Sequence, residues 1–292
     1  MKIAIYGNAF NPVKAKYIQH LIHKLEEHNI ALIIESQFHD FLIDHLHFTK
    51  KTQLFETAKE IPADTDILLS IGGDGTLLNT ITLVRDSGIP ILGINTGTLG
   101  FISSVSTDQI DSALNQIFKK EYSIEKRTLL QLDTNNQLFG ETNFALNEVT
   151  VLKKDTSSMI RIHAYLDGEF LNSYWADGLI IATPTGSTGY SLSCGGPIVV
   201  PGTENFIISP IAPHNLNVRP VIVSEDREII LRVEDRDELA LVALDSRSRA
   251  IDPILELTIR KADFKANFIK LHSQSFIATI REKLMWGKDK RN

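Results

Sequence analysis

The stretch ILLSIGGDGTLLN, residues 67–79, joins an apolar strand pattern, a glycine-rich turn and the start of a helical pattern. Residues 67–71 are short, mostly aliphatic and bounded by turn residues, as in a buried parallel strand. The glycines that follow let the backbone turn sharply and approach a ligand closely, because they carry no Cβ. The spacing after the turn predicts a helix capped by Thr76, and the free N–H groups at such a helix start favour an anion.

Asp74 is the unexpected member of this turn. A carboxylate beside a phosphate site is repelled unless a cation or a proton transfer gives it a function. A glycine turn with a solvated aspartate is the purely structural alternative. The turn matches neither the GxxxxGK[ST] phosphate loop nor the GxGxxG dinucleotide motif, so the rest of the chain must decide its meaning.

Length and composition limit the class of protein. The 292 residues suffice for two domains with separate cores, and 43% hydrophobic with 23% charged residues is usual for a globular protein. No segment approaches the ~18 uncharged apolar residues of a membrane span, so we expect a cytoplasmic protein without a membrane partner. The single Cys194 excludes an internal disulfide and a multi-cysteine metal site. With a net charge of −6 and no block of like charge, we expect no nucleic-acid partner.

Strand and helix patterns alternate over residues 1–121. This alternation predicts a Rossmann-like α/β domain with a mostly parallel sheet. Glycine-rich turns at 72–76 and 96–101 follow two of the strands, and ligands bind at the carboxyl ends of strands in such sheets. The helical stripes consist of Ile18, Leu21, Ile22 and Leu25 in one helix and of Ile110, Ala113, Leu114 and Ile117 in another.

The pattern changes to period two near residue 122. Residues 122–273 are therefore expected to form a mainly antiparallel β domain. Ser275 then begins a last helix with apolar residues on one face. Because a single helix needs a surface on which to pack, we expect residues 274–292 to return to the first domain.

Two further segments carry groups suited to a nucleotide. Residues 177–198, DGLIIATPTGSTGYSLSCGGPI, combine small residues, hydroxyls and Tyr190, whose ring can stack on a base. Asn147 and Glu148, in the run ALNEVTV, can read an adenine edge and accept hydrogen bonds from ribose hydroxyls. A hairpin corner with exposed hydroxyls and two ordinary strand residues are the structural alternatives.

The order of the motifs resembles that of the NAD kinase family over about residues 64–245. GGDGT alone is shared with diacylglycerol and sphingosine kinases and is close to the GGDGS of 6-phosphofructokinases, which are not expected to carry TGSTGYSLSxGGPI. The resemblance implies phosphorylation of the adenosine-ribose 2′-hydroxyl of NAD⁺ by ATP, which gives NADP⁺ and ADP. It rests on GGDGT at 72–76, NTGTLGF at 95–101, LNE at 146–148, the segment 177–198 and PHNLNVRP at 213–220.

The resemblance also implies roles for single residues. Asp74 corresponds to the catalytic residue that accepts the proton of the attacking hydroxyl, with Mg²⁺ or another divalent cation accompanying ATP. Asp177 corresponds to a residue that contacts the other end of the dinucleotide. No metal-ligating residue is predicted, and a homo-oligomer, a dimer or tetramer, is implied. The full set of implied binding residues is Gly73, Asp74, Gly75, Phe101, Asn147, Glu148, Asp177, Thr188, Gly189, Tyr190, Ser191, Leu192, Ser193, Ala212 and Arg247.

The sequence departs from the family pattern in three places. Gly189 stands where many members have alanine, and Asn79 stands where a basic residue often faces the phosphates. Residues 245–247, Asp-Ser-Arg, replace the common Asp-Gly-Gln, so we expect Arg247 to supply a cation to a phosphate. A dinucleotide sensor without turnover and another GGDGT-type lipid or sugar kinase stay open as alternatives. The presence of Asp74 speaks against the sensor.

Overall fold

The structure, a computed structural model, describes residues 1–97, 100–102, 105–154, 159–234, 240–252, 255–272 and 274–287. It divides into two compact units, Met1–Lys126 with Ala266–Asn292 and Arg127–Lys265. The chain passes from one unit to the other within two strands, β7 (Tyr122–Asp133) and β18 (Glu256–Leu271). No helix in the described part is long and apolar enough to cross a bilayer. Part of the motif at 95–101 and the last five residues lie outside the described residues.

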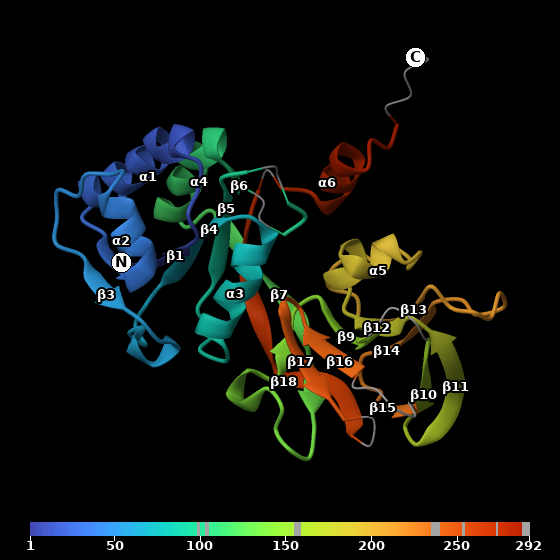
Figure 1. Ribbon diagram of the computed structural model, residues 1–292. Helices are drawn as coiled ribbons and strands as arrows, with labels where there is room; N and C mark the ends of the chain where they lie inside the picture. Colours follow the sequence, from blue (N-terminus) through green and yellow to red (C-terminus); the bar gives the residue numbers. More distant parts are fainter. Residues whose placement is uncertain are drawn as a thin grey trace. The chain divides into compact units, whose positions relative to one another are not determined.

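The first unit contains the predicted parallel sheet (Figure 1). Its order is β18, β5, β4, β1, β2, β3, with β6 paired to β5, and each of these pairings is parallel. The order places β4 and β5 side by side, so that the turns after these strands emerge at the same edge. The strands are β1 (Lys2–Gly7), β2 (Ala31–Glu35), β3 (Gln53–Phe55), β4 (Ile67–Gly72), β5 (Ile91–Asn95) and β6 (Val105–Ser106).

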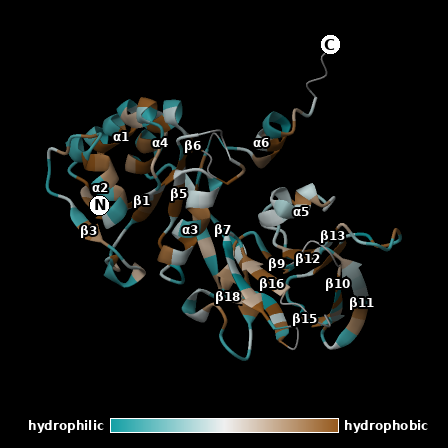
Figure 2. Ribbon diagram, in the orientation of Figure 1, coloured by the Kyte–Doolittle hydropathy of each residue, from teal (hydrophilic) through white to brown (hydrophobic). Residues whose placement is uncertain are grey.

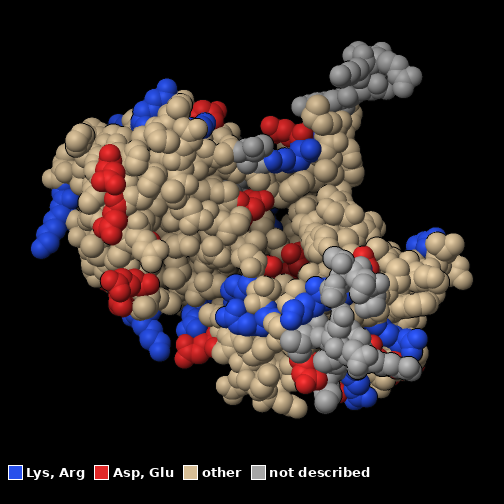
Figure 3. All heavy atoms as spheres, viewed as in Figure 1, with Lys and Arg blue, Asp and Glu red and all other residues tan. Residues whose placement is uncertain are grey.

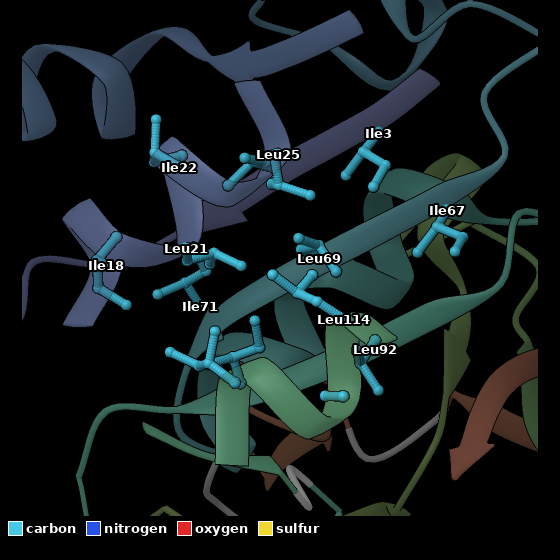
Figure 4. Close-up of a cluster of buried hydrophobic side chains, with 14 of the residues drawn as sticks. Ile3, Ile18, Leu21, Ile22, Leu25, Ile67, Leu69, Ile71, Leu92 and Leu114 are labelled. Carbon is cyan, nitrogen blue, oxygen red and sulfur yellow. The ribbon is translucent and has the colours of Figure 1, made fainter. Parts of the chain in front are cut away.

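Helices cover both faces of this sheet. Side chains of α1 (Ala15–Glu27), α2 (Ser36–Ile43) and α4 (Ile110–Phe118) share one core with Ile67, Leu69 and Ile71 of β4 (Figure 4). Helix α3 (Asp74–Val84) lies on the opposite face, where the Thr80 hydroxyl donates to Ser70 Oγ at 2.8 Å. Hydrophobic and hydrophilic residues alternate along α1 (Figure 2), and both predicted apolar stripes are buried.

Helix α3 begins two residues before the predicted cap. Gly73 is its N-cap, with an extended backbone (φ −100°, ψ −168°), and Asp74 is its first residue. The prediction that Thr76 caps the helix is wrong, because the glycine turn already redirects the chain before Asp74. Thr76 instead lies in the first turn, where its hydroxyl accepts a hydrogen bond from Asn8 Nδ2 at 3.2 Å. Gly72 has φ +155°, and a Cβ there would lie 2.2 Å from Thr76 Oγ1.

The second unit contains two sheets with a hydrophobic core formed from both. The antiparallel six-stranded sheet has the order β14, β13, β12, β9, β16, β17, and the other sheet contains the antiparallel run β11, β10, β15, β18 together with β7 and β8. This confirms the predicted antiparallel β fold. The strands are β8 (Phe144–Ala145), β9 (Glu148–Lys153), β10 (Ile160–Leu166), β11 (Glu169–Ala176), β12 (Gly178–Ala182), β13 (Asn205–Ile211), β14 (Val221–Ser224), β15 (Ile229–Glu234), β16 (Ala240–Leu244) and β17 (Arg247–Ile251).

Two short helices complete the described chain. Helix α5 (Tyr190–Ser193) follows β12, and a small second cluster of apolar side chains from β12 and β13 packs with Val199. Helix α6 (Phe276–Lys283) belongs to the first unit, and Ser275 caps it as predicted by accepting a hydrogen bond from the Ala278 N–H at 3.4 Å. Single 3₁₀ turns lie at Pro12–Lys14, Ala58–Glu60, Thr107–Gln109, Gly140–Thr142 and Gly186–Thr188. On the face drawn in Figure 3, Lys and Arg are interspersed with Asp and Glu.

Candidate active site

Asp74 lies where β4 passes into α3. Its Oδ2 accepts a hydrogen bond from the Phe101 N–H at 2.8 Å, and its Oδ1 accepts one from the Ile102 N–H at 3.2 Å. Both N–H groups belong to the loop after β5, the strand next to β4. The structure therefore brings Asp74 and Phe101 together and fixes the carboxylate by backbone groups from a second loop.

Gly100 packs against Asp74, a contact that the sequence analysis did not predict. A Cβ at Gly100 would lie 1.8 Å from Asp74 Oδ1 and 2.3 Å from Asp74 Cγ, so that any other residue here would displace either this carboxylate or the loop. In contrast, a Cβ at Gly73 or Gly75 would have no neighbouring atom within 4 Å. These two glycines leave open space beside Asp74, as a turn that receives a ligand requires.

A second cluster forms in the second unit, where the start of β9 meets the turn after β12. A Cβ at Gly186 would lie 2.1 Å from the Asn147 carbonyl oxygen, and one at Gly189 would lie 3.1 Å from Glu148 Oε2. The backbone of Tyr190 hydrogen-bonds to the Glu148 carboxyl. The structure thus brings together Asn147, Glu148, Gly189 and Tyr190.

Two side-chain atoms of this cluster lack partners. Asn147 Oδ1 and Glu148 Oε2 are buried, and neither has a hydrogen bond to any described residue. Leaving such a group unsatisfied costs about 1–3 kcal/mol, so buried polar atoms in native proteins are normally paired. A bound molecule with N–H or O–H donors would satisfy both atoms, which supports their assignment to a ligand.

The Glu148 carboxyl is set to hold its proton at neutral pH. Burial, together with the neighbouring Asp245 carboxylate, raises the pKa of Glu148 to about 8, against a hydrogen bond from the Tyr190 backbone that lowers it. A protonated carboxyl donates one hydrogen bond and accepts others. Glu148 can therefore exchange hydrogen bonds in both directions with ribose hydroxyls.

Replacing Glu148 should change how stability depends on pH. In the unfolded chain the carboxyl ionises near 4.5, whereas the folded chain keeps the proton up to about 8. The free energy of unfolding of the wild type therefore decreases as the pH rises between these two values, because the unfolded chain releases a proton that the folded chain retains. The side chain of Glu148→Gln cannot titrate. As the pH rises from about 4.5 to 8, the Tm of this variant should therefore increase by several degrees relative to the wild-type Tm. A Tm difference that does not vary with pH would contradict the assignment.

Asp177 and Ala212 lie at the other end of β12. Gly178 pairs with Ile211 at this end, whereas Ala182 pairs with Glu148 at the opposite end, about 13 Å away along the strand at 3.3 Å per residue. The Asp177 carboxylate forms an ion pair with Lys153 Nζ at 2.7 Å. Burial raises the pKa of the Tyr190 hydroxyl, and the charges of Cys194, Asp177 and Glu148 add to the rise. Tyr190 therefore lies within the fields of carboxylates from both ends of the strand.

Other predicted binding residues are engaged within their own unit. Ser191 is fully buried and shares a hydrogen bond with the Ser209 hydroxyl at 3.0 Å, and the Thr188 hydroxyl donates to the Thr185 carbonyl at 3.2 Å. Leu192 and Ser193 follow on α5. Arg247 donates to two backbone carbonyl oxygens, and Asn79 hydrogen-bonds to Tyr6.

Both parts of the chain match models of one family. Residues 3–122 match the ATP-NAD kinase N-terminal domain, and residues 146–271 match the ATP-NAD kinase C-terminal domain. The NAD kinase of Flavobacterium psychrophilum is 48% identical over 294 residues and that of Cytophaga hutchinsonii 45% identical over 300 residues, and each match covers 100% of both chains.

Solved structures agree with these matches. The NAD kinase of Archaeoglobus fulgidus in complex with ATP superposes with a TM-score of 0.76 at 28% identity, covering 98% of this chain and 99% of that one. Yeast NADH kinase complexed with NADH has a TM-score of 0.85 at 22% identity, covering 99% of this chain and 89% of that one, and shows the shared fold. The chain therefore belongs to the ATP-NAD kinase family and is a phosphotransferase.

Proposed function

We propose that this protein transfers the γ-phosphoryl group of ATP to the 2′-hydroxyl of the adenosine ribose of NAD⁺, which yields NADP⁺ and ADP. The observation that carries the proposal is the environment of Asp74. Its carboxylate stands at the start of a helix, is held by the N–H groups of Phe101 and Ile102, and faces a turn in which Gly73 and Gly75 leave space for a ligand. Relatives named NAD kinase, which match this chain over its whole length, support it.

The reaction requires a base and a site for phosphate oxygens. The ribose O2′ bonds to the γ-phosphorus while the bond from that phosphorus to the bridging oxygen of ADP breaks. Asp74 accepts the proton that O2′ loses, which orients the attacking oxygen and keeps it nucleophilic. The glycine turn and the free N–H groups at the start of α3 receive the phosphate oxygens, because a helix N-terminus attracts anions.

We propose that Mg²⁺ or another divalent cation enters the site with ATP. Among the described residues, no three His, Cys, Asp or Glu side chains gather into a metal-binding group. This donor set fits a cation held mainly by phosphate oxygens, which is how Mg²⁺ commonly binds with nucleotides. The cation would neutralise the charge that develops on the transferred group.

The second unit supplies the groups that bind the dinucleotide. Asn147 and Glu148 hold the adenine and its ribose through the two atoms that lack protein partners, and the ring of Tyr190, which is 41% exposed, stacks on the base. Asp177, at the far end of β12, contacts the other end of the dinucleotide, and Ala212, which lies at the same end of β12, contacts the same ligand. The proposed set further includes Thr188, Gly189, Ser191, Leu192 and Ser193.

The proposal also covers the roles of the two domains, the cellular location and the oligomeric state. Residues 1–121 with 274–292 act as the nucleotide-binding domain, and residues 122–273 carry the substrate motifs. The protein works in the cytoplasm as a homo-oligomer, which is a dimer or a tetramer. Measurement of its mass by light scattering would distinguish the two.

The direct test is turnover of NAD⁺. Purified protein with ATP, Mg²⁺ and NAD⁺ should form NADP⁺, which an NADP-specific dehydrogenase reports, and omission of ATP should abolish the signal. Binding of NAD⁺ without turnover would instead favour a dinucleotide sensor. Absence of both binding and turnover would favour a lipid or sugar kinase that shares the GGDGT turn.

A further inference from the structure

The turn between β16 and β17 is joined to the segment that begins β9. The Asp245 carboxylate accepts hydrogen bonds from three successive N–H groups, those of Leu146 at 2.9 Å, Asn147 at 2.8 Å and Glu148 at 3.2 Å. In the opposite direction, the Asp245 N–H donates to the Glu148 carbonyl oxygen at 3.0 Å. A single residue from a distant turn thus holds the backbone of both proposed ligand-binding residues.

Arg247 acts on the same segment from two residues further on. Its guanidinium donates to the carbonyl oxygens of Thr142 and Phe144 and lies 5.8 Å from the centre of the Phe144 ring. The carboxylate of Asp245 thus gathers N–H groups, and the guanidinium of Arg247 gathers carbonyl groups, from residues 142–148. The negative charge of Asp245 thus binds backbone N–H groups of residues 146–148, and the positive charge of Arg247 binds backbone carbonyl groups of residues 142 and 144.

We propose that Asp245 and Arg247 form a clamp that positions Asn147 and Glu148 for dinucleotide binding, an inference that rests on the proposed function. Side chains that recognise a ligand must be held within about 0.5 Å of the productive geometry by their supporting residues. The side chains of Asn147 and Glu148 project from the backbone that the clamp fixes. Asp245 is therefore a positioning residue, and Arg247 serves the clamp instead of supplying a cation to a phosphate, as the sequence suggested.

Asp245→Asn tests the first half of the clamp. An amide has one acceptor oxygen, and its NH₂ group would face an N–H donor, so at least one of the three hydrogen bonds is lost. Because the lost hydrogen bond loosens the backbone that carries Asn147 and Glu148, the KM for NAD⁺ should rise about tenfold or more. The KM for ATP and kcat should stay within about threefold of wild type. A purely structural role would lower Tm and leave the KM for NAD⁺ unchanged.

Asp167→Asn is the matched control. Asp167 lies in the turn between β10 and β11 of the same unit, with φ +50° against φ +53° for Asp245. Its carboxylate also accepts a backbone hydrogen bond, from the Glu228 N–H at 2.9 Å, and pairs with Arg227. The same substitution in the same kind of turn should therefore leave the KM for NAD⁺ unchanged.

Arg247→Lys and Arg247→Ala separate the clamp from a phosphate contact. Lysine keeps the charge but lacks the rigid fork of donors that reaches two carbonyl oxygens. If Arg247 belongs to the clamp, both variants should raise the KM for NAD⁺ several-fold. Near-normal kinetics in Arg247→Lys, with loss only in Arg247→Ala, would show that the charge matters and would overturn the assignment of Arg247. This pair also decides the proposal if Asp245→Asn does not fold.

Calorimetric titration of NAD⁺ into each variant, without ATP, tests the clamp independently of the proposed reaction. If wild type forms NADP⁺ and the Asp245 and Arg247 variants bind NAD⁺ as wild type does, the clamp is overturned and the reaction stands. If wild type binds NAD⁺ without turnover, the reaction fails, and weaker binding by the variants still supports the clamp. If wild type does not bind NAD⁺, both are overturned.

Discussion

Asp74→Asn is expected to lower kcat by about 10²- to 10⁴-fold while the Kd for NAD⁺ stays within about twofold. The amide has nearly the shape of the carboxylate but cannot accept the proton of the ribose hydroxyl. Its single oxygen can still accept from one of the N–H groups of Phe101 and Ile102, so the loop after β5 loses one hydrogen bond and the fold is kept. The coupled assay gives kcat, calorimetry gives Kd, and circular dichroism reports folding.

Asp86→Asn provides the matched control for this substitution. Asp86 is exposed and lies just beyond the other end of helix α3, so that the same change of charge occurs in the same unit away from the turn. It should leave kcat at the wild-type value. If Asp74→Asn also turns over at the wild-type rate, Asp74 is not the base.

Gly100→Ala is expected to lower kcat by at least about 10²-fold although it adds only one methyl group. The new Cβ would lie 1.8 Å from Asp74 Oδ1, so either the carboxylate or the loop must move. A displacement of about 1 Å in a reacting group can cost 10²-fold in rate. Gly97→Ala is the control from the same loop, because its Cβ would meet no atom closer than Asn95 Oδ1 at 3.8 Å, and it should keep near-normal kcat.

The double variant Asp74→Asn/Gly100→Ala identifies the cause of the Gly100 effect. If the methyl group acts by displacing the carboxylate, it should add little once that carboxylate is gone, because residues that act as a unit are not additive. If the fold-reduction in kcat of the double variant equals the product of the two single reductions, Gly100 does not act through the Asp74 carboxylate. Full activity in the single variant would exclude the contact altogether.

Local regularity made the fold readable from the sequence. The spacing of Ile18, Leu21, Ile22 and Leu25 predicts a helix face because it follows from helix geometry, and all four side chains are buried. The change to period two near residue 122 predicted the antiparallel sheets for the same reason. The start of α3 was misplaced because a glycine N-cap gives a weaker signal than the threonine three residues later.

The contacts that complete the candidate site could not be read in this way. Asp74 meets the amides of Phe101 and Ile102, and Asp245 meets those of residues 146–148, across 27 to 99 positions of sequence. No periodicity links residues so far apart, because their distance depends on strand order and turn shape. The sequence therefore indicated Arg247 as a charge for a phosphate, when the structure shows its guanidinium on backbone carbonyls.

The unpaired oxygens of Asn147 and Glu148 link function to the survival of the folded chain. Folding forgoes hydrogen bonds at these two atoms. In the proposed function a bound nucleotide restores them, so saturation with ligand should favour the folded over the unfolded population by mass action. Resistance to proteases would then follow the supply of dinucleotide. Substitutions that remove the two oxygens should stabilise the ligand-free protein and abolish ligand binding. Selection for the reaction therefore retains two residues that destabilise the ligand-free fold.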